Sequence, residues 1–249
     1  MKIKILFLVL AIQSCLHAAV WHGQIDGLSS YYSYREPGFM KIEGLMSGAS
    51  AGVSVLTAHF YFEGRGDLEK GNLHYTSPIS GNIGHVPHTL HEMEIKVGLH
   101  LQRLVLYSGL GLRYLDDNAQ GLFTNTGHFG FDRESRYIYL PIGVSYTERL
   151  SSRWEITPRV EGDILLQGTQ TNKIQGQTVT NKQRAGDGVR VEICFLRHAN
   201  KMSLVFTPFI SVWDISQSNV TTSSFWWLRT CAEPRNITIQ AGCKLGIQF

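Results

Sequence analysis

The sequence predicts an all-β protein: a single transmembrane, antiparallel, up-and-down β-barrel of ten strands. Three observations predict this fold. The last thirteen residues alternate strictly between apolar side chains and polar or glycine residues, short and long polar connections alternate along the chain, and no run of eighteen apolar residues follows residue 19. A period of two indicates a strand because successive side chains point to opposite faces. A helical membrane protein is excluded, since each span would need about 20 apolar residues.

Residues 1–19 predict a cleaved secretory signal peptide, which leaves one barrel domain over residues 20–249. Two lysines precede the apolar run Ile5–Ile12, and small residues at Ala18 and Ala19 supply a cleavage site. The run is too short to cross a bilayer. Cys15 leaves lipidation open as an alternative.

The charge balance excludes nucleic acid as a partner. Removing residues 1–19 takes away two of 23 basic residues and none of 20 acidic ones, so 21 remain against 20, a net charge of +1. Such a chain lacks the basic footprint that nucleic-acid binding requires. The remaining cysteines are Cys194, Cys231 and Cys243, which are too few for a disulfide-stapled scaffold and are expected to be free thiols.

Short and long connections alternate in the order expected for a membrane barrel. The short connections are Ser47–Gly48, Gln102–Arg103, Arg149–Arg153 and His198–Lys201, and the long ones are Gly64–Leu90, Asp116–Glu134, Gly168–Gly186 and Gln217–Arg235, with a small one at Glu36–Gly38. Short periplasmic turns and long extracellular loops are typical of these barrels. The loop 170–185 is polar enough to be expected to be mobile.

Ten segments lie between these connections, of roughly ten residues or more in most cases, which is about the length needed to cross an outer membrane as a tilted strand. They are residues 24–35, 39–46, 49–63, 91–101, 104–115, 135–148, 153–167, 187–197, 202–216 and 236–249. An even count places both termini on the periplasmic side. Eight strands remain the alternative if 24–46 stays outside the barrel. Segment 49–63 changes parity, which predicts a bulge within it.

The final segment carries the most specific pattern. Its apolar parity is Phe249, Ile247, Leu245, Cys243, Ala241, Ile239 and Ile237. A strand of this kind, ending on an aromatic residue without a polar tail, resembles the closing strand of bacterial outer-membrane β-barrels, in which the terminal aromatic is part of the assembly signal. The resemblance implies that Leu245, Ile247 and Phe249 form that signal and that the barrel assembly machinery and outer-membrane lipid are partners. Lys244 departs from the usual pattern, which has glycine there. The edge strand of a soluble sandwich is the alternative for this segment alone.

Aromatic residues and prolines mark particular levels of the predicted strands. Four aromatic residues on the apolar parity lie near the periplasmic ends, where an interfacial girdle is expected: Tyr146, Trp154, Phe195 and Phe249. Three prolines fall inside strands and predict local bulges or kinks: Pro141, Pro158 and Pro208. The phrases around these prolines resemble ones that recur in outer-membrane barrels.

If the apolar parity faces lipid, the other parity places charges in the lumen. The expected network is Glu92, Glu94, Lys96, Arg113, Glu155, Arg159, Glu161, Asp163, Arg190, Glu192 and Lys244, and the same parity includes Arg35, Lys41 and Glu43. Seven acids oppose seven bases, and pairing offsets the cost of removing charges from water. Because ten strands enclose a narrow lumen, this network predicts a plug rather than an open pore.

Two loop motifs are further candidates for a site. His85, His88 and His91 recur every three residues and are weak candidates for a metal site, so no metal or cofactor is expected. The sequence Phe225–Trp226–Trp227 is a candidate recognition surface in the last long loop, with packing or an upper girdle as the alternative.

Enzymatic activity is the less favoured hypothesis. Ten-stranded outer-membrane proteases resemble this chain in size and hold an Asp–His pair and an Asp pair at the outer rim. The nearest counterparts here are Asp116–Asp117 and Asp214 near the rims and His128 with Asp132 in one loop. No aspartate and histidine lie two apart on a predicted strand, and no serine–histidine grouping like that of lipid A deacylases is present.

The sequence therefore predicts a protein of a Gram-negative bacterial outer membrane, with a charge-plugged lumen and long extracellular loops. Its expected role is structural, or interaction and adhesion through an extracellular ligand or host surface. A narrow transport channel and an outer-membrane hydrolase, either a protease or a lipid-modifying enzyme, are the alternatives.

Overall fold

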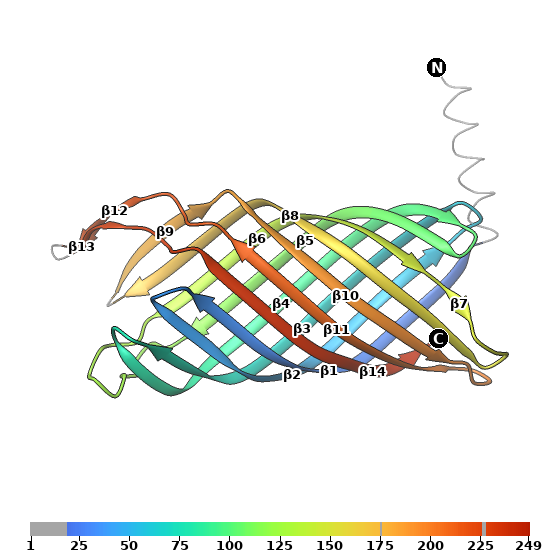
Figure 1. Cartoon of the computed structure of the whole chain (residues 1–249), viewed down its shortest axis with the longest axis horizontal. Helices are drawn as coiled ribbons and strands as arrows, with labels where there is room; N and C mark the ends of the chain where they lie inside the picture. Colours follow the sequence, from blue (N-terminus) through green and yellow to red (C-terminus); the bar gives the residue numbers. More distant parts are fainter. Residues whose placement is uncertain (1–18, 175, 226–227) are drawn as a thin grey trace, which may run out of the picture.

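The computed structural model describes residues 19–174, 176–225 and 228–249, and within them the chain is all β (Figure 1). Ten long strands form the wall of a closed barrel, which is the predicted fold class. They are β1 (Val20–Glu36), β2 (Met40–Leu56), β3 (Phe60–Ser77), β4 (Gly81–Leu101), β5 (Leu104–Asn118), β6 (Asp132–Tyr146), β8 (Trp154–Ile174), β10 (Gly186–Arg197), β11 (Ser203–Ile215) and β14 (Asn236–Gln248). Among the described residues, no helix has the length and apolar character needed to cross a membrane.

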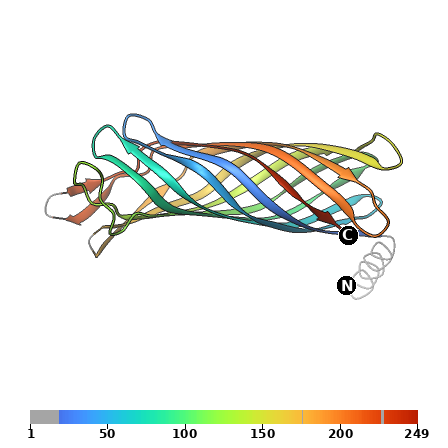
Figure 2. The same cartoon turned by 90° about the horizontal axis from the view of Figure 1, so that it is seen from below.

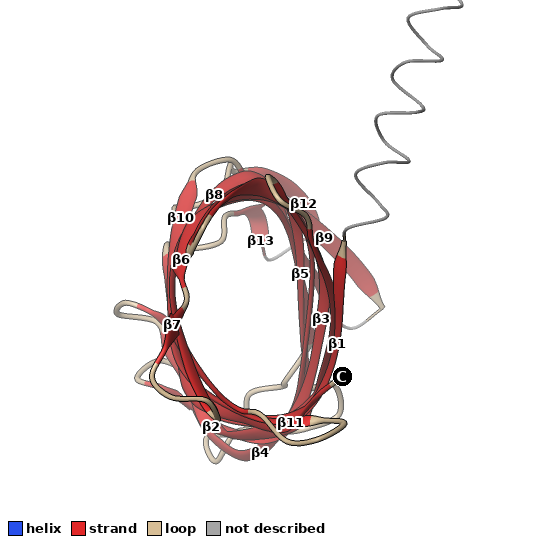
Figure 3. Cartoon of the chain, turned by 90° about the vertical axis from the view of Figure 1, so that its right-hand side faces the viewer, coloured by secondary structure: helices blue, strands red, loops and turns tan. Residues whose placement is uncertain are grey.

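Each long strand pairs antiparallel with its neighbours along the chain, and β1 pairs with β14 to close the ring. Viewed along its axis, the ring is oval (Figure 3). Four short strands lie outside this order: β7 (Glu148–Arg149), β9 (Gln177–Gln183), β12 (Thr221–Phe225) and β13 (Leu228–Cys231). Because the barrel has no free edge, every wall strand must place one face toward the lumen and one outward.

Both ends of the described chain lie at the same end of the barrel, together with the short turns (Figures 1 and 2). Short turns mark the periplasmic end of such barrels, so we call this the periplasmic end and the opposite end the outer end. The outer end carries the loop 119–131 and the hairpins built from β9, β12 and β13 (Figure 1). Eight strands are excluded, because residues 24–46 belong to β1 and β2 in the wall.

The outward faces form an apolar belt. Ile95 is 70% exposed and Leu245 65% exposed, and both lie on walls otherwise covered by apolar side chains. A soluble protein rarely exposes a contiguous apolar surface of this extent. The predicted girdle residues Tyr146, Trp154 and Phe249 are exposed at the periplasmic end of the belt, and Phe195 stacks on Phe206 beside them.

Two predicted connections between residues 39 and 91 are wrong. Ser47–Gly48 lies inside β2, and Gly64–Leu90 is not a loop but most of the β3–β4 hairpin, whose turn is residues 78–80. The parity change in 49–63 is caused by a turn at residues 57–59, not by a bulge, because Thr57 Oγ1 accepts a hydrogen bond from the Phe60 amide there. The predicted count of ten strands is nevertheless correct. The predicted turn at residues 47–48 does not exist, but the turn at residues 57–59, which was not predicted, divides the same stretch into two strands.

The prediction of a mobile loop over the polar segment 170–185 is also wrong. Instead of a mobile loop, this segment contains the end of β8 and the strand β9, which pair from Gly168–Gln183 to Ile174–Gln177. Beyond the membrane neither face of a strand needs to be apolar, so the alternation that reveals a lipid-facing strand is absent here.

The prolines within the wall have unequal effects. The β5–β6 ladder is interrupted at Leu140 and Pro141, and the β10–β11 ladder is interrupted at Pro208, as the missing amide donor requires. The register of β6 against β8 also shifts between Ile138 and Tyr139. Pro158, by contrast, stays in register opposite Ile193.

The seam between β1 and β14 ends on Phe249. Its amide and carbonyl exchange hydrogen bonds with Gly23 at 2.9 and 2.8 Å. The Phe249 ring lies against Gly23 so closely that a Cβ added to this glycine would be 2.6 Å from the ring. The last residue therefore covers a glycine of the first strand at the point where the barrel closes.

We expect Phe249→Ser to impair assembly much more than Gln248→Ser, because only Phe249 packs against the seam and faces lipid. The fraction of protein that migrates as the compact, heat-modifiable form in unboiled electrophoresis samples measures assembly. Equal folded fractions for the two variants would contradict the proposed role of Phe249.

Candidate functional site in the barrel lumen

The lumen is divided into four levels along the barrel axis. From the periplasmic end these are a polar vestibule, a network of charged side chains, an apolar plug and a second cavity at the outer end. Inward positions of the wall strands supply all four levels, since side chains alternate between lumen and exterior.

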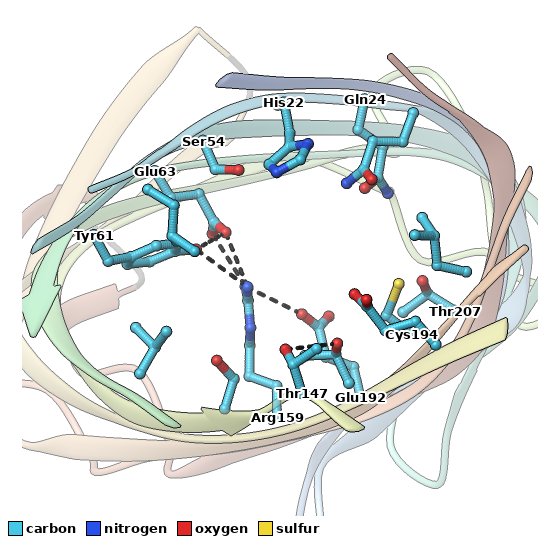
Figure 4. Close-up of a pocket in the computed structure, with 18 of the residues that line it drawn as sticks. His22, Gln24, Ser54, Tyr61, Glu63, Thr147, Arg159, Glu192, Cys194 and Thr207 are labelled. Carbon is cyan, nitrogen blue, oxygen red and sulfur yellow. Dashed lines mark hydrogen bonds and ion pairs between the residues drawn. The ribbon is translucent and has the colours of Figure 1, made fainter. Parts of the chain in front are cut away.

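The vestibule is a cavity of about 600 Å³. Its lining includes Gln24, His100 and the thiol-bearing Cys194. Figure 4 shows Arg159 reaching across this space toward Glu63 on the opposite wall. The vestibule thus ends at charged side chains rather than continuing through the barrel.

The first tier of the network is centred on two arginines. The Arg159 guanidinium donates to Glu63 at 2.9 and 3.1 Å and lies 3.4 Å from Glu192. Arg65 pairs with the same Glu192 at 3.1 Å and with Asp67, also at 3.1 Å. These pairs join β3 to β8 and β10, which are not neighbours in the sheet, so they fasten opposite walls together. Lys244 Nζ, 2.7 Å from Asp67, adds the closing strand β14.

The second tier is centred on Lys96 and Arg190. Lys96 Nζ lies 2.9 Å from Glu94 and 2.5 Å from Glu161, and Arg190 lies 3.3 Å from Glu94. Tyr139 donates its hydroxyl to Glu94 at 2.9 Å and to Glu92 at 2.8 Å. These charged side chains are almost fully buried. Removing one partner of a buried ion pair leaves an uncompensated charge, which costs roughly 3–5 kcal/mol.

Acids outnumber bases around this tier. Glu94, Glu161 and Asp163 place carboxylate oxygens within 4.8 Å of one another, the one such group of potential metal ligands among the described residues. Lys96 already occupies the position between Glu94 and Glu161. Neither oxygen of the buried Asp163 has a hydrogen-bond partner in this part of the chain.

Two residues of the expected network lie apart from it. Arg113 is buried beside the Trp213 ring, 5.4 Å from its centre, at the level of the apolar plug. Glu155 lies at the periplasmic rim, 3.7 Å from His198. The remaining nine expected residues face the lumen at the two tiers.

The predicted inward orientation of three further charges is wrong. Lys41 and Glu43 form an ion pair to which Tyr31, 46% exposed on the outer surface, donates its hydroxyl, and Arg35 is exposed. These residues lie on the part of β1 and β2 above the apolar belt. An outward charge there meets water rather than lipid and carries no desolvation cost.

Sequence reasoning missed the inward charges of β3. They are Glu63, Arg65, Asp67 and Glu69, which alternate with outward Gly64, Gly66 and Leu68. The charges at every second position were the available signal. It was hidden because glycine supplies no apolar side chain to the lipid face, so the period of two seemed absent.

Above the network, the lumen is filled by an apolar plug. Tyr139 meets Trp213 edge-on with ring centres 5.0 Å apart, and Tyr32, Met46 and Leu90 are fully buried in the same cluster. Aromatic rings fill a wide lumen efficiently because each buries a large area. At the edge of this plug the outer loop residue Glu233 accepts a hydrogen bond from Gln170 at 2.6 Å, and burial raises the pKa of Glu233.

The histidines of the β3–β4 hairpin do not come together. His85 is exposed, His91 points outward against Tyr114, and His88 points into the lumen. His88 Nδ1 instead pairs with Asp117, the residue directly opposite it on β5, and its ring lies 4.6 Å from Tyr32. An Asp–His pair therefore exists, but on adjacent strands, where a search along single strands could not find it.

Other rim candidates do not converge on this pair. Asp116 points outward, Asp214 pairs with Arg235 on the outer surface, and His128 shares a hydrogen bond with Thr126 in its own loop. Asp132 begins β6 and accepts a hydrogen bond from the Gln120 amide. Phe225 ends β12, whereas Trp226 and Trp227 lie outside the described residues.

Comparison with known proteins gives the fold. The chain is similar to the outer membrane protease OmpT of Escherichia coli, with a TM-score of 0.60 and 8% identity over 92% of this chain and 96% of that one. It also matches the β domain of the Bordetella autotransporter BrkA (TM-score 0.44, 12% identity, 89% and 98% covered) and Ail of Yersinia pestis (0.34, 8%, 92% and 98%). Neither a protein-family model nor a curated protein matches the sequence.

The fold is that of a bacterial outer-membrane β-barrel. Together with the apolar belt, it makes the chain an integral protein of an outer membrane. The likeness to OmpT carries no residue assignments, and the roles of the lumen charges rest on their geometry in this chain.

We expect Arg159→Met to lower the free energy of unfolding by at most roughly 3–5 kcal/mol, because Glu63 loses both of its bonds to Arg159 while Glu192 keeps its pair with Arg65. Adding Glu63→Gln should recover part of the loss, since it removes the carboxylate that lost its closest partner. Urea unfolding in lipid vesicles, followed by tryptophan fluorescence, measures the change.

Arg149→Met is the matched control, because Arg149 is exposed and, among the described residues, its guanidinium donates hydrogen bonds only to the carbonyls of Ser151 and Ser152. Unfolding of Arg159→Met at the wild-type urea concentration would show that the network does not hold the opposite walls together.

Proposed function

We propose that this protein is a non-conducting surface protein of the outer membrane that works through its outer end as an interaction or adhesion protein. The single observation that carries the proposal is the filled middle of the lumen, where the charge network and the apolar plug are stacked. A transport role would require a continuous path, and a structural or interaction role requires none.

The side chains that fill the middle of the lumen are connected to one another by ion pairs and hydrogen bonds. Lys96 and Arg190 join several carboxylates in one buried network, and Tyr139 belongs to both levels, because its hydroxyl reaches Glu92 and Glu94 while its ring packs on Trp213. Such a network fixes the side chains in place. An ion entering the lumen would have to break several buried pairs.

The outer end supports an interaction role because apolar side chains there face water. Phe39, Ile79, Phe123 and Phe129 are about half to two-thirds exposed. Their segments are joined, since the Ser77 hydroxyl donates to the Phe39 carbonyl at 2.7 Å and the loop residue Asn125 bonds to Asn82. Grouped apolar side chains on an exposed surface mark interaction sites. We call these four residues the crown patch.

In planar bilayers, the wild-type protein should show little steady conductance, because the lumen is filled at two levels. An open porin in the same bilayers establishes that the assay detects a conducting barrel, and the double variant Tyr139→Ala, Trp213→Ala should stay near the wild type because the charge network below the plug remains. Large, stable, ohmic steps from the wild type would identify a channel and overturn the proposal.

Cells that display the wild-type barrel should adhere to surfaces coated with extracellular-matrix proteins, and the crown variant Ile79→Ser, Phe123→Ser should lose most of this adhesion. The matched control is Val220→Ser, an equally exposed apolar residue near β12 that lies outside the crown patch. Equal adhesion by wild type, crown variant and barrel-free cells would exclude adhesion to these surfaces through the crown patch.

A further inference from the structure

A second cavity, of about 440 Å³, lies at the outer end above the apolar plug. We call it the outer cavity. Its walls come from several strands and from the loop 119–131, and they are mainly apolar: Met40, Ile42, Tyr75, Ile83, Val86, Ala119, Phe129, Phe131 and Ile174. Protein interiors are normally packed without voids much larger than water. A cavity of this size falls in the range of ligand sites, about 300–1,000 Å³.

The loop over the outer cavity is held in a defined position. Asn125 accepts a hydrogen bond from the Asn82 amide at 2.8 Å and donates its own amide to the Asn82 carbonyl at 3.0 Å. Thr126 Oγ1 donates to the Ser80 carbonyl at 2.6 Å. The rings of Phe123 and Phe129 pack with centres 4.8 Å apart. The loop is therefore fastened to the β3–β4 turn, and the space beneath it is a preformed feature of the fold.

Two charged residues among those described line the outer cavity, and each already has a hydrogen-bonding partner. The Asp117 carboxylate pairs with His88, and Arg133 donates to Glu36 at 2.7 Å while its guanidinium lies near the rings of Tyr34 and Phe131. A charged ligand would gain no unpaired partner here and would lose its hydration in an apolar space. An uncharged ligand would not incur this cost of lost hydration. A carboxylate oxygen of Asp117 remains a strong acceptor for one hydroxyl group.

We propose that the outer cavity binds a small, uncharged, mainly apolar molecule that carries one hydroxyl group, with the apolar body against Ile83 and Val86 and the hydroxyl on Asp117. The site shares Phe129 with the crown patch, but the proposal does not depend on the adhesion role. Apolar cavities of proteins bind molecules of this kind because water finds few hydrogen-bonding partners in them and is readily displaced.

The test uses the full barrel in lipid nanodiscs and equilibrium dialysis against protein-free discs, which subtracts partitioning into lipid. The probes share one apolar body and differ in their polar group: 2-naphthol, naphthalene, 2-naphthoate and 2-naphthylmethylamine. We expect one equivalent of 2-naphthol to bind above the lipid background, about threefold to tenfold more tightly than naphthalene, as one net hydrogen bond implies. The two charged probes should bind more weakly than naphthalene.

Two substitutions should block the site by filling it. Ile83→Phe fills the cavity from β4 and Ala119→Phe fills it from the loop, and each should weaken 2-naphthol binding at least about tenfold. The control is Ile79→Phe in the same hairpin, because Ile79 is 67% exposed and does not line the cavity. Heat-modifiable migration confirms folding of each variant, and the second filling variant serves if the first does not fold.

A third substitution tests the polar contact. Asp117→Asn should reduce the preference for 2-naphthol over naphthalene, whereas Asp116→Asn, on the outward face of the same strand, should leave it unchanged. The proposal is overturned if the wild type binds no probe above the lipid background. Unchanged binding in a folded cavity-filling variant, or tightest binding of a charged probe, would overturn it as well.

Discussion

Closure of β1 against β14 is the constraint on which the rest of the structure depends. Once the ring is closed, no strand has a free edge, and every inward side chain must share one narrow lumen. Small residues at the seam permit close approach, and Phe249 covers Gly23 where the two strands end. The outward-facing side chains are apolar because they contact lipid. The inward-facing side chains must instead fill the lumen without leaving polar groups unpaired.

The lumen meets that demand differently in its two halves. Toward the periplasm it uses charges, and several pairs run between walls that are not adjacent in the sheet, such as Arg159 with Glu63 and Arg190 with Glu92. Toward the outer end the lumen is filled by aromatic rings and aliphatic side chains. Tyr139 connects the two halves, because its hydroxyl bonds to Glu94 and its ring packs on Trp213. Buried ion pairs add little net stability compared with apolar packing, but their breakage is costly. The charged half therefore joins particular walls across the lumen, and the apolar half fills the space with large buried side chains.

The sequence predicted the strands whose outward face is made of large apolar side chains. Leu245, Ile247 and Phe249 on β14, or Val189 and Val191 on β10, expose the period of two directly. It failed where glycine replaced those side chains, as at Gly64 and Gly66 in β3, and where strands leave the membrane, as in β9. In both places the physical cause of the pattern, contact with hydrocarbon through a side chain, is missing. The His88–Asp117 pair and the outer cavity lay beyond sequence reasoning for another reason, since both depend on the register of β4 against β5.

The filled middle has a consequence for how the two ends of the molecule can act. The periplasmic vestibule is polar and ends on Arg159, while the outer cavity is apolar and ends on the plug residues Ile42 and Val86. The second tier around Lys96 and the apolar plug lie between them. A molecule in the outer cavity therefore interacts with the loop 119–131 and with the β3–β4 turn to which that loop is fastened. Those same segments carry three of the four crown-patch residues, Ile79, Phe123 and Phe129. The cavity and the crown patch therefore meet at this loop, where Phe129 lines the one and belongs to the other.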